Sequence, residues 1–314
     1  MQNDQPNRFR RRAVLGGLGV GLAGIGAGFV YRQSPLFWRQ FARELGQPVE
    51  TPIHRPNPKR WPDRGVYAAW LGHATVLLKI DGFTILTDPV FSTRVGLNLG
   101  PLTVGLKRLV QPALAMNQLP KIDLVLLSHA HMDHFDIPSL RALERKGVEV
   151  VTARATSDLL RTERYRRVQE AGWGETVRVG PATIRGLEVR HWGARMRTDT
   201  WRGYNGYLIG AGRWRVLFGG DTAMTHTFRD VGGADLALMP IGAYDPWIRN
   251  HCSPEQAWGM SEDARAAHVL PVHHATFNLS NEPATEPIER LVSAAGTQRE
   301  RVALTSIGQE FRLS

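Results

Sequence analysis

The stretch Ser128-His129-Ala130-His131-Met132-Asp133-His134 decides how the rest of the chain is interpreted. It places three imidazoles and a carboxylate within six residues, directly after the apolar run Asp123–Ser128 that is typical of a strand covered on both faces. Imidazole and carboxylate together suit zinc, which accepts nitrogen and oxygen ligands. The stretch therefore predicts a metal centre in a loop at a strand end. We expect His129 and His131 to converge on one ion, and Asp133 and His134 to point toward a second.

Three more candidate ligands stand where predicted strands end. His191 follows the strand 182–189, Asp221 follows the strand 215–218, and His273 follows the strand 269–272. Alone, each would be an ordinary histidine or a turn-forming aspartate. Together with the first four they give seven ligands, enough for two zinc ions that share one bridging carboxylate and keep room for a water molecule.

Outside this stretch, short apolar runs alternate with helical segments from Gly65 onward, which predicts an α/β fold with both sheet faces covered. The Asp81-Gly82 dipeptide predicts a hairpin turn. Asp136 is expected to cap a helix that Gly147 ends, and Ser253-Pro254-Glu255-Gln256 is typical of a capping box that starts another. The expected strands are 66–71, 76–80, 83–87, 123–128, 148–152, 182–189, 204–209, 215–218, 236–240, 269–272 and 302–304.

Composition excludes several classes of protein. The chain has 314 residues, of which 42% are hydrophobic and 22% are charged, so it is neither disordered nor fibrous. A single cysteine, Cys252, excludes an internal disulfide. The net charge is +10, but residues 1–64 carry eleven Lys or Arg against four Asp or Glu, so little positive charge remains for the other residues. A nucleic-acid partner is therefore not expected.

The N-terminal segment has the pattern of a targeting signal. Arginines precede the uncharged run from Ala13 to Tyr31, and Arg11-Arg12-Ala13-Val14-Leu15 fits a twin-arginine export pattern. We expect residues 1–33 to form a twin-arginine-like signal or membrane anchor, with the rest of the chain on the periplasmic side of the inner membrane. A cytoplasmic, membrane-associated location is the alternative.

Residues 34–64 contain six prolines and are expected to form an extended linker. The aromatic residues at its start, Phe37, Trp38 and Phe41, could lie on a membrane surface or pack on the catalytic domain. The long apolar stretch from Val95 to Met116 is expected to be an irregular loop, which either takes up acyl chains or simply packs.

With these motifs in place, the chain resembles the metallo-β-lactamase fold hydrolases, whose mark is H-x-H-x-D-H followed by later His, Asp and His ligands. Within them it is most similar to the group of N-acylphosphatidylethanolamine-hydrolysing phospholipases D, over residues 65 to about 312. The blocks that carry this resemblance, besides the metal motif, are Trp70-Leu71-Gly72-His73-Ala74-Thr75, Leu86-Thr87-Asp88-Pro89-Val90-Phe91-Ser92, Gly219-Gly220-Asp221-Thr222, Pro240-Ile241-Gly242-Ala243-Tyr244-Asp245-Pro246 and His273-His274-Ala275-Thr276-Phe277.

The resemblance implies a four-layer αββα sandwich over residues 65–314. It implies that His129, His131 and His191 bind one zinc, that Asp133, His134 and His273 bind the other, and that Asp221 bridges them. Asp133 would also orient the attacking water.

His251 matches a family histidine at the edge of the site, where it would bind phosphate or protonate a leaving group, although it could also merely precede a helix cap. His274 stands where this group often has tryptophan, so we expect a smaller and more polar pocket wall for the substrate. His73 is expected to support the site or the fold rather than to bind metal.

The activity that the resemblance implies is hydrolysis of N-acyl-phosphatidylethanolamine or a related phosphodiester by a binuclear zinc centre, in which iron or manganese could replace zinc. A phospholipid substrate and a membrane surface are the expected partners, and a homodimer is compatible with the sequence. A lactonase or another carboxylic-ester or amide hydrolase is the alternative, because the same centre can attack a carbonyl group. A membrane-associated metal-binding scaffold is the alternative that is not an enzyme.

Overall fold

The computed structural model describes residues 44, 46–99, 102–196 and 198–314. Residues 48–314 form one compact unit. Among the described residues, no helix is long and apolar enough to cross a membrane. The expected signal or anchor of residues 1–33 and the aromatic residues Phe37, Trp38 and Phe41 lie outside the described residues.

The first sheet has seven strands and combines an antiparallel half with a parallel half. Strands β15, β1, β2 and β3 pair antiparallel, whereas β3, β6, β7 and β8 pair parallel. The strand order is β15 (Glu310–Leu313), β1 (Val66–Gly72), β2 (Thr75–Ile80), β3 (Phe83–Thr87), β6 (Leu124–Leu126), β7 (Glu149–Ala153) and β8 (Arg167–Ala171).

The second sheet has six strands and is mixed in the same way. Strands β12, β13 and β14 pair parallel, and β9 to β12 pair antiparallel. The order is β14 (Ala266–Val272), β13 (Ala234–Pro240), β12 (Trp214–Phe218), β11 (Gly206–Ala211), β10 (Ala182–Leu187) and β9 (Thr176–Val179). A separate hairpin joins β4 (Arg94–Leu99) to β5 (Leu102–Lys107).

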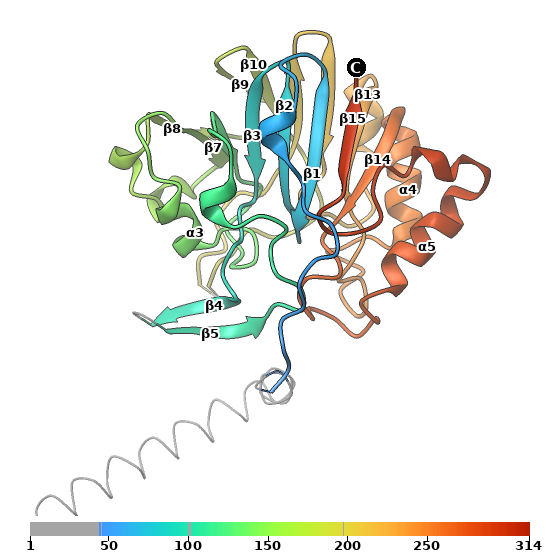
Figure 1. Ribbon diagram of the computed structural model, residues 1–314, viewed down its shortest axis with the longest axis horizontal. Helices are drawn as coiled ribbons and strands as arrows, with labels where there is room; N and C mark the ends of the chain where they lie inside the picture. The colour runs from blue at the N-terminus through green and yellow to red at the C-terminus, as the bar shows by residue number, and fades with distance from the viewer. Residues whose placement is uncertain (1–43, 45, 100–101, 197) are drawn as a thin grey trace, which may run out of the picture. The chain divides into compact units, whose positions relative to one another are not determined.

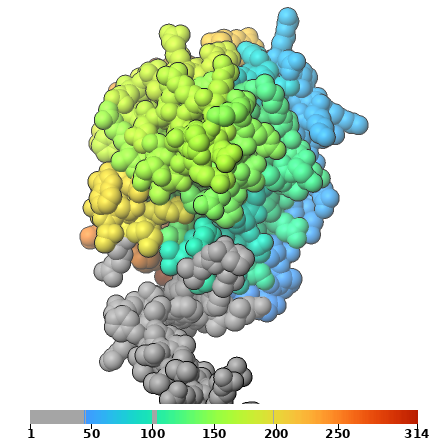
Figure 2. All heavy atoms as spheres, turned by 90° about the vertical axis from the view of Figure 1, so that its left-hand side faces the viewer, coloured from blue at the N-terminus to red at the C-terminus, as the bar shows by residue number. Residues whose placement is uncertain are grey.

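The two sheets enclose the main hydrophobic core, which includes Leu78 and Ile85 of the first sheet and Ile209 and Phe218 of the second. A second core lies between the other face of the second sheet and helices α4 (Pro254–Asp263) and α5 (Glu286–Ala295). Figure 1 shows these helices outside the second sheet and α3 (Ile137–Ala142) on the opposite side of the molecule. Figure 2 shows how the chain around β7 and β8, in green to yellow-green, closes the face on the α3 side. The predicted αββα sandwich is confirmed.

Most predicted strands are confirmed, with ends shifted by a few residues. The capping box before α4 is also confirmed, since Ser253 accepts a hydrogen bond from the Gln256 backbone N–H and the Gln256 side chain bonds back to Ser253. Three expectations were wrong. Residues 302–304 form only a single bridge, from Val302 to Val269. The helix after Asp136 ends at Ala142, well before Gly147. The stretch 95–116, expected to be irregular, contains the β4–β5 hairpin.

The Pro-rich segment is extended in its described part and packs against the domain. From Pro48 onward it belongs to the same compact unit as the sheets. Pro52, Pro56 and Pro58 are buried, and the Trp61 indole N–H donates to the Glu310 carboxylate at 2.7 Å. The proline rings and Trp61 remove apolar surface from water there, so the packed domain begins near Pro48 rather than at residue 65.

The topology gathers strand ends at one edge of the sandwich. Strand β1 runs parallel to β3 because both are antiparallel to β2, and β3 is parallel to β6. In the second sheet β10 runs in the direction of β12, since both are antiparallel to β11, and β12 is parallel to β14. The carboxyl ends of strands in open α/β sheets are where ligands bind, so this edge is the place to look for a site.

Candidate metal centre

The loop after β6 folds tightly enough to bring its four candidate ligands together. The backbone N–H groups of His134 and Phe135 both donate to the carbonyl of His131, at 3.1 and 2.7 Å. This turn reverses the chain within the motif, so that side chains one to five residues apart face a common centre. His129 and His134 are buried, whereas His131 and Asp133 are partly exposed.

Three imidazoles form the first group that could hold a metal ion. The Nδ1 atom of His131 lies 2.8 Å from Nε2 of His129 and 3.2 Å from Nε2 of His191. All three ligand atoms lie within 4.8 Å of one another. His191 arrives from the loop after β10, and its other ring nitrogen, Nδ1, bonds the carbonyl of Asn250 at 2.9 Å, which leaves Nε2 free for a cation.

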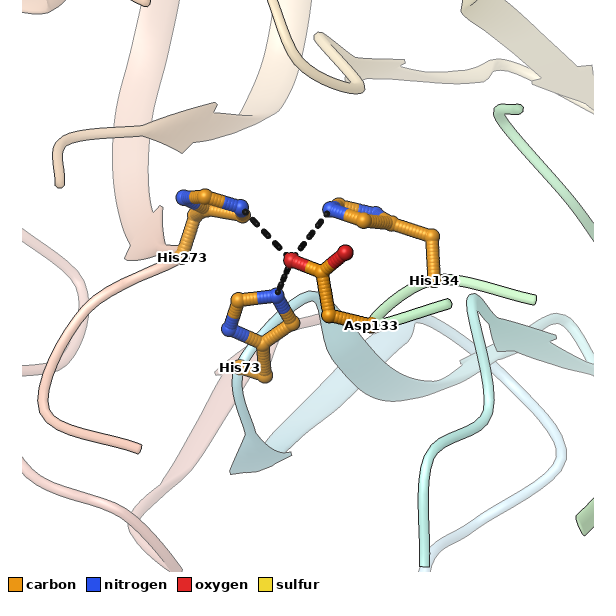
Figure 3. Close-up of side chains that lie close together, drawn as sticks. All are labelled: His73, Asp133, His134 and His273. Atoms are coloured by element: carbon orange, nitrogen blue, oxygen red, sulfur yellow. Dashed lines mark hydrogen bonds and ion pairs between the residues drawn. The ribbon is translucent and has the colours of Figure 1, made fainter. Parts of the chain in front are cut away.

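The second group surrounds the carboxylate of Asp133 (Figure 3). Its Oδ2 atom lies 3.6 Å from Nε2 of His134 and 3.6 Å from Nε2 of His273. His73 also joins this group, with its Nε2 atom 2.9 Å from the same oxygen. The structure therefore gathers the expected residues and adds an imidazole from the turn between β1 and β2.

Asp221 lies between the two groups. Its Oδ2 atom is 3.9 Å from Nε2 of His129 and 3.7 Å from Nε2 of His191. The same oxygen is 3.1 Å from Nε2 of His134 and 3.1 Å from Nε2 of His273. One carboxylate oxygen that reaches nitrogens of both groups has the placement that a bridging ligand needs.

Unpartnered polar atoms show that the residues fit a pair of cations. The Nε2 atoms of His134 and His273 and the Oδ1 atom of Asp221 are buried and have no hydrogen-bond partner. Leaving such atoms unpaired costs about 1–3 kcal/mol each, so buried polar groups are nearly always satisfied. Cations held among these nitrogens and oxygens would satisfy them, and the clusters therefore suit a dinuclear metal site.

The electrostatics of the cluster support the same interpretation. Burial lowers the pKa of His134 and of His273, but the negative charges of Asp221 and Asp133 outweigh it, and the pKa of His273 rises to about 9. Burial raises the pKa of Asp221, yet the facing His134 and His273 hold it well below its usual range. The carboxylates thus keep protons on imidazoles where cations would sit, and metal binding would release those protons.

The comparisons with known proteins assign the family. A family model for the β-lactamase superfamily domain matches residues 84–274. The chain belongs to this superfamily. It is 32% identical to an uncharacterized protein of Mycobacterium tuberculosis over 287 residues, covering 87% of this chain and 76% of the relative. It is 30% identical to N-acyl-phosphatidylethanolamine-hydrolyzing phospholipase D 1 of Caenorhabditis elegans over 253 residues, covering 73% of this chain and 69% of the relative.

Among solved structures, a metallo hydrolase from the archaeon Ignicoccus hospitalis matches with a TM-score of 0.58 and 19% identity, covering 80% of this chain and 99% of that one. This likeness shows the fold. Taken together, the matches and the metal-binding clusters show a metal-dependent hydrolase of the β-lactamase superfamily.

Asp88 supports both ligand groups of this superfamily member, and the sequence did not assign it a role. Its carboxylate, just after β3, accepts hydrogen bonds from the Ser128 backbone N–H at 2.7 Å, from Ser128 Oγ at 2.5 Å and from Nδ1 of His134 at 2.7 Å. Ser128 Oγ in turn lies 2.9 Å from Nδ1 of His129. These bonds keep the Nδ1 proton on both rings and turn Nε2 toward the metal site. The signal was present in the Leu86–Ser92 block, where Asp88 follows an apolar strand.

Arg195 fastens the His191 loop to the metal motif, and nothing in the sequence pointed to it. A single nitrogen, Nη1, donates to the carbonyls of Ala130 at 3.0 Å and Phe135 at 2.8 Å. Burial lowers the pKa of this guanidinium. The side chain thus ties a ligand of the second sheet to the loop of the first.

A pocket of about 230 Å³ opens above the metal-binding side chains. Trp192, Trp247 and Leu279 line it together with His251, whose Nδ1 atom is unpartnered and lies 3.8 Å from Oδ2 of Asp221. Burial lowers the pKa of His251 to about 4, so the ring is neutral at pH 7. His251 therefore lies at the rim of the site, where the resemblance places it.

His274 does not line this pocket. Its ring packs against Trp70, with centroids 4.5 Å apart, and it is 5% exposed. It lines a small cavity behind His273 and is not among the residues that line the pocket above the metal-binding cluster. Its predicted contact with substrate stays a prediction.

Proposed function

We propose that this protein is a binuclear zinc phosphodiesterase of the phospholipase D type, acting on N-acyl-phosphatidylethanolamine or a related lipid phosphodiester. The observation that carries the proposal is the 30% identity to a relative named for that activity, over 253 residues that cover 73% of this chain. A yeast protein with the same activity in its name is 32% identical over 242 residues.

The donor set supports zinc as the metal. Five imidazoles and two carboxylates are borderline nitrogen and hard oxygen donors, and no thiolate takes part, because the one cysteine, Cys252, bonds the carbonyl of Pro240 instead. His129, His131 and His191 would hold one ion, and Asp133, His134 and His273 the other, with Asp221 shared between them. When bound, two such cations would lower the pKa of a bound water molecule and supply positive charge that stabilises the negative charge formed in the reaction.

The chain's own groups would do the rest of the chemistry. The Asp133 carboxylate would orient the attacking water as well as bind metal. The neutral His251 ring would donate its one N–H as a hydrogen bond, either to a phosphoryl oxygen or to the oxygen of the departing alcohol. Trp192, Trp247 and Leu279 form an apolar wall that would exclude bulk water and accept hydrocarbon next to the phosphodiester.

We also propose that the protein works at the inner membrane on its periplasmic side, held there by residues 1–33, with a phospholipid bilayer as its partner. Removing residues 1–43 would leave the compact unit from Pro48 intact. The shortened protein should hydrolyse a soluble phosphodiester as the full chain does but lose activity on vesicles. Equal loss on both substrates would contradict the anchoring role.

The activity is tested with zinc-loaded full-length protein and vesicles that contain N-acyl-phosphatidylethanolamine. We expect release of phosphatidic acid and the N-acyl ethanolamine, measured by mass spectrometry. The same preparation is assayed on a lactone and a carboxylic ester. Faster turnover of the lactone, with no phosphatidic acid released, would replace the phosphodiesterase by the carbonyl hydrolase.

A matched pair of variants separates an enzyme from a metal-binding scaffold. His131→Ala removes a ligand of the first group, whereas His226→Ala removes an exposed imidazole outside the site. We expect the first to abolish turnover and the second to leave it unchanged. Turnover that survives in His131→Ala would show that the hydrolysis does not come from this centre.

A further inference from the structure

His73 lies in the turn between β1 and β2, 60 positions before Asp133, and its side chain is buried. In Figure 3 the rings of His73, His134 and His273 each direct a nitrogen at the same Asp133 oxygen, and His73 does so from below. We propose that His73 is a positioning residue whose Nε2–H donates to Asp133 Oδ2 and holds this carboxylate for the second cation. The inference rests on the dinuclear centre and not on the choice of substrate.

Asp221 lies near four of the five expected metal-binding histidines and near His251 at the rim, but not near His73. Oδ2 of Asp221 lies between 3.1 and 3.9 Å from a ring nitrogen of His129, His134, His191, His251 and His273. Among the described residues, His73 makes no such contact with Asp221, and its one carboxylate neighbour within ion-pair distance is Asp133, at 2.9 Å. The His73 ring therefore contacts Asp133 without contacting Asp221, the carboxylate that lies between the two groups of ligands. A nitrogen in that place supports a ligand rather than replacing one.

The backbone of His73 is strained and firmly held. Its φ angle is +52°, in the left-handed region that side chains other than glycine rarely adopt. The His73 N–H donates to Thr276 Oγ1 at 2.6 Å, and its carbonyl accepts from the Trp70 indole at 2.8 Å and from the His273 N–H at 3.0 Å. Such strain persists where the surroundings over-determine it, commonly at functional sites. The three bonds fix the backbone of His73, and the bond from the His273 N–H links it directly to the backbone of an expected metal ligand.

Two other roles are compatible with this place, and they predict different behaviour. The ring lies 4.2 Å from His273 and 5.2 Å from Phe277, centroid to centroid, so it could act only by packing. It could also bind the second cation itself through Nε2. A donor to Asp133 needs an N–H at this position, a packing residue needs a flat ring, and a metal ligand needs a nitrogen without a proton.

Two substitutions separate these roles. His73→Phe keeps a flat ring and removes the donor, whereas His73→Gln removes the ring and keeps an amide N–H. Full-length protein stripped of metal by a chelator is titrated with Co²⁺, and both equivalents are followed by visible absorption and native mass spectrometry. In His73→Phe we expect the first equivalent to bind as in the wild type and the second about 10- to 100-fold more weakly. In His73→Gln both should bind within about threefold of the wild type.

Controls and a second measurement keep the test decisive. His226→Phe and His226→Gln change an exposed histidine in the same two ways and should not alter either equivalent. If His73→Phe does not fold, ¹⁵N-histidine spectra of the zinc-loaded wild type still report whether Nε2 of His73 carries a proton, with His73→Gln giving the assignment. Wild-type Co²⁺ binding by His73→Phe, equal loss of the second equivalent in both variants, or an unprotonated Nε2 would each overturn the proposal.

Discussion

The two sheets supply their ligands in different ways. The loop after β6 of the first sheet contributes His129, His131, Asp133 and His134 within six residues, and the hydrogen bonds at the carbonyl of His131 shape it locally. The second sheet contributes only His191, Asp221 and His273, each from a separate strand end. The first set is thus a property of one short segment, whereas the second depends on three strands running to the same edge. Asp221 of the second set lies near nitrogens of both ligand groups. Its substitution should therefore weaken both cation sites.

The largest effect is expected at Asp221. Asp221→Asn keeps the shape of the side chain and removes the charge that faces nitrogens of both groups. We expect it to weaken binding of both cations and to lower kcat/KM by more than about 100-fold, beyond the usual effect of groups that only support a ligand. Metal content by mass spectrometry and steady-state kinetics measure this. Loss of one cation only would show that Asp221 belongs to a single group.

The next effect is expected at Asp88, on the first sheet. Asp88→Asn leaves an oxygen for the Ser128 N–H but replaces Oδ2, the one acceptor that Ser128 Oγ and His134 share, by an NH₂ group. We expect metal affinity to fall about 10- to 100-fold. The control is Asp123→Asn, a carboxylate of the same sheet that bonds the Thr84 N–H far from the cluster. Unchanged Co²⁺ binding in Asp88→Asn would show that the loop after β6 keeps its shape without outside support.

A smaller effect is expected where Arg195 joins the two sheets. Arg195→Met keeps an unbranched apolar stem and removes both bonds to the metal loop, so we expect the first cation to bind about tenfold more weakly. Arg195→Lys should restore most of this affinity, because one nitrogen makes both bonds and an ammonium can do the same. Failure of lysine to restore binding would indicate that packing of the guanidinium on Phe135, at 5.9 Å, matters more.

The smallest effect is expected on the outer face of the second sheet. The Arg290 guanidinium bonds Glu255 and lowers the pKa of that carboxyl to about 2 from its ordinary 4.5. A lowered pKa stabilises the fold above pH 4.5, and this stabilisation is lost as the pH falls toward 2. Glu255→Gln should lower the free energy of unfolding by about 0.5 kcal/mol at pH 7 and by almost nothing near pH 2, measured by urea unfolding. Metal binding should not change, because the pair joins α4 to α5 and lies outside the cluster.

Sequence reasoning was most accurate where the signal is local. The metal motif, the Asp81-Gly82 hairpin and the capping box at Ser253 depend on residues a few positions apart, and each is found as expected. It was least accurate where pairing partners are distant. Strand β15 exists because residues 310–313 pair with β1, and the 302–304 run lacks a full partner and makes one bridge.

The sequence alone determined which residue types could bind metal and which strands would carry them, because periodicity and motif spacing are local properties of the chain. Only the tertiary structure decided which distant groups meet. His73 reaches Asp133 across 60 positions, and its N–H reaches Thr276 across 203. Such contacts depend on strand order and register, which no short segment specifies, and for that reason the roles of Asp88 and Arg195 and the carboxylate partner of His73 emerged only from the fold.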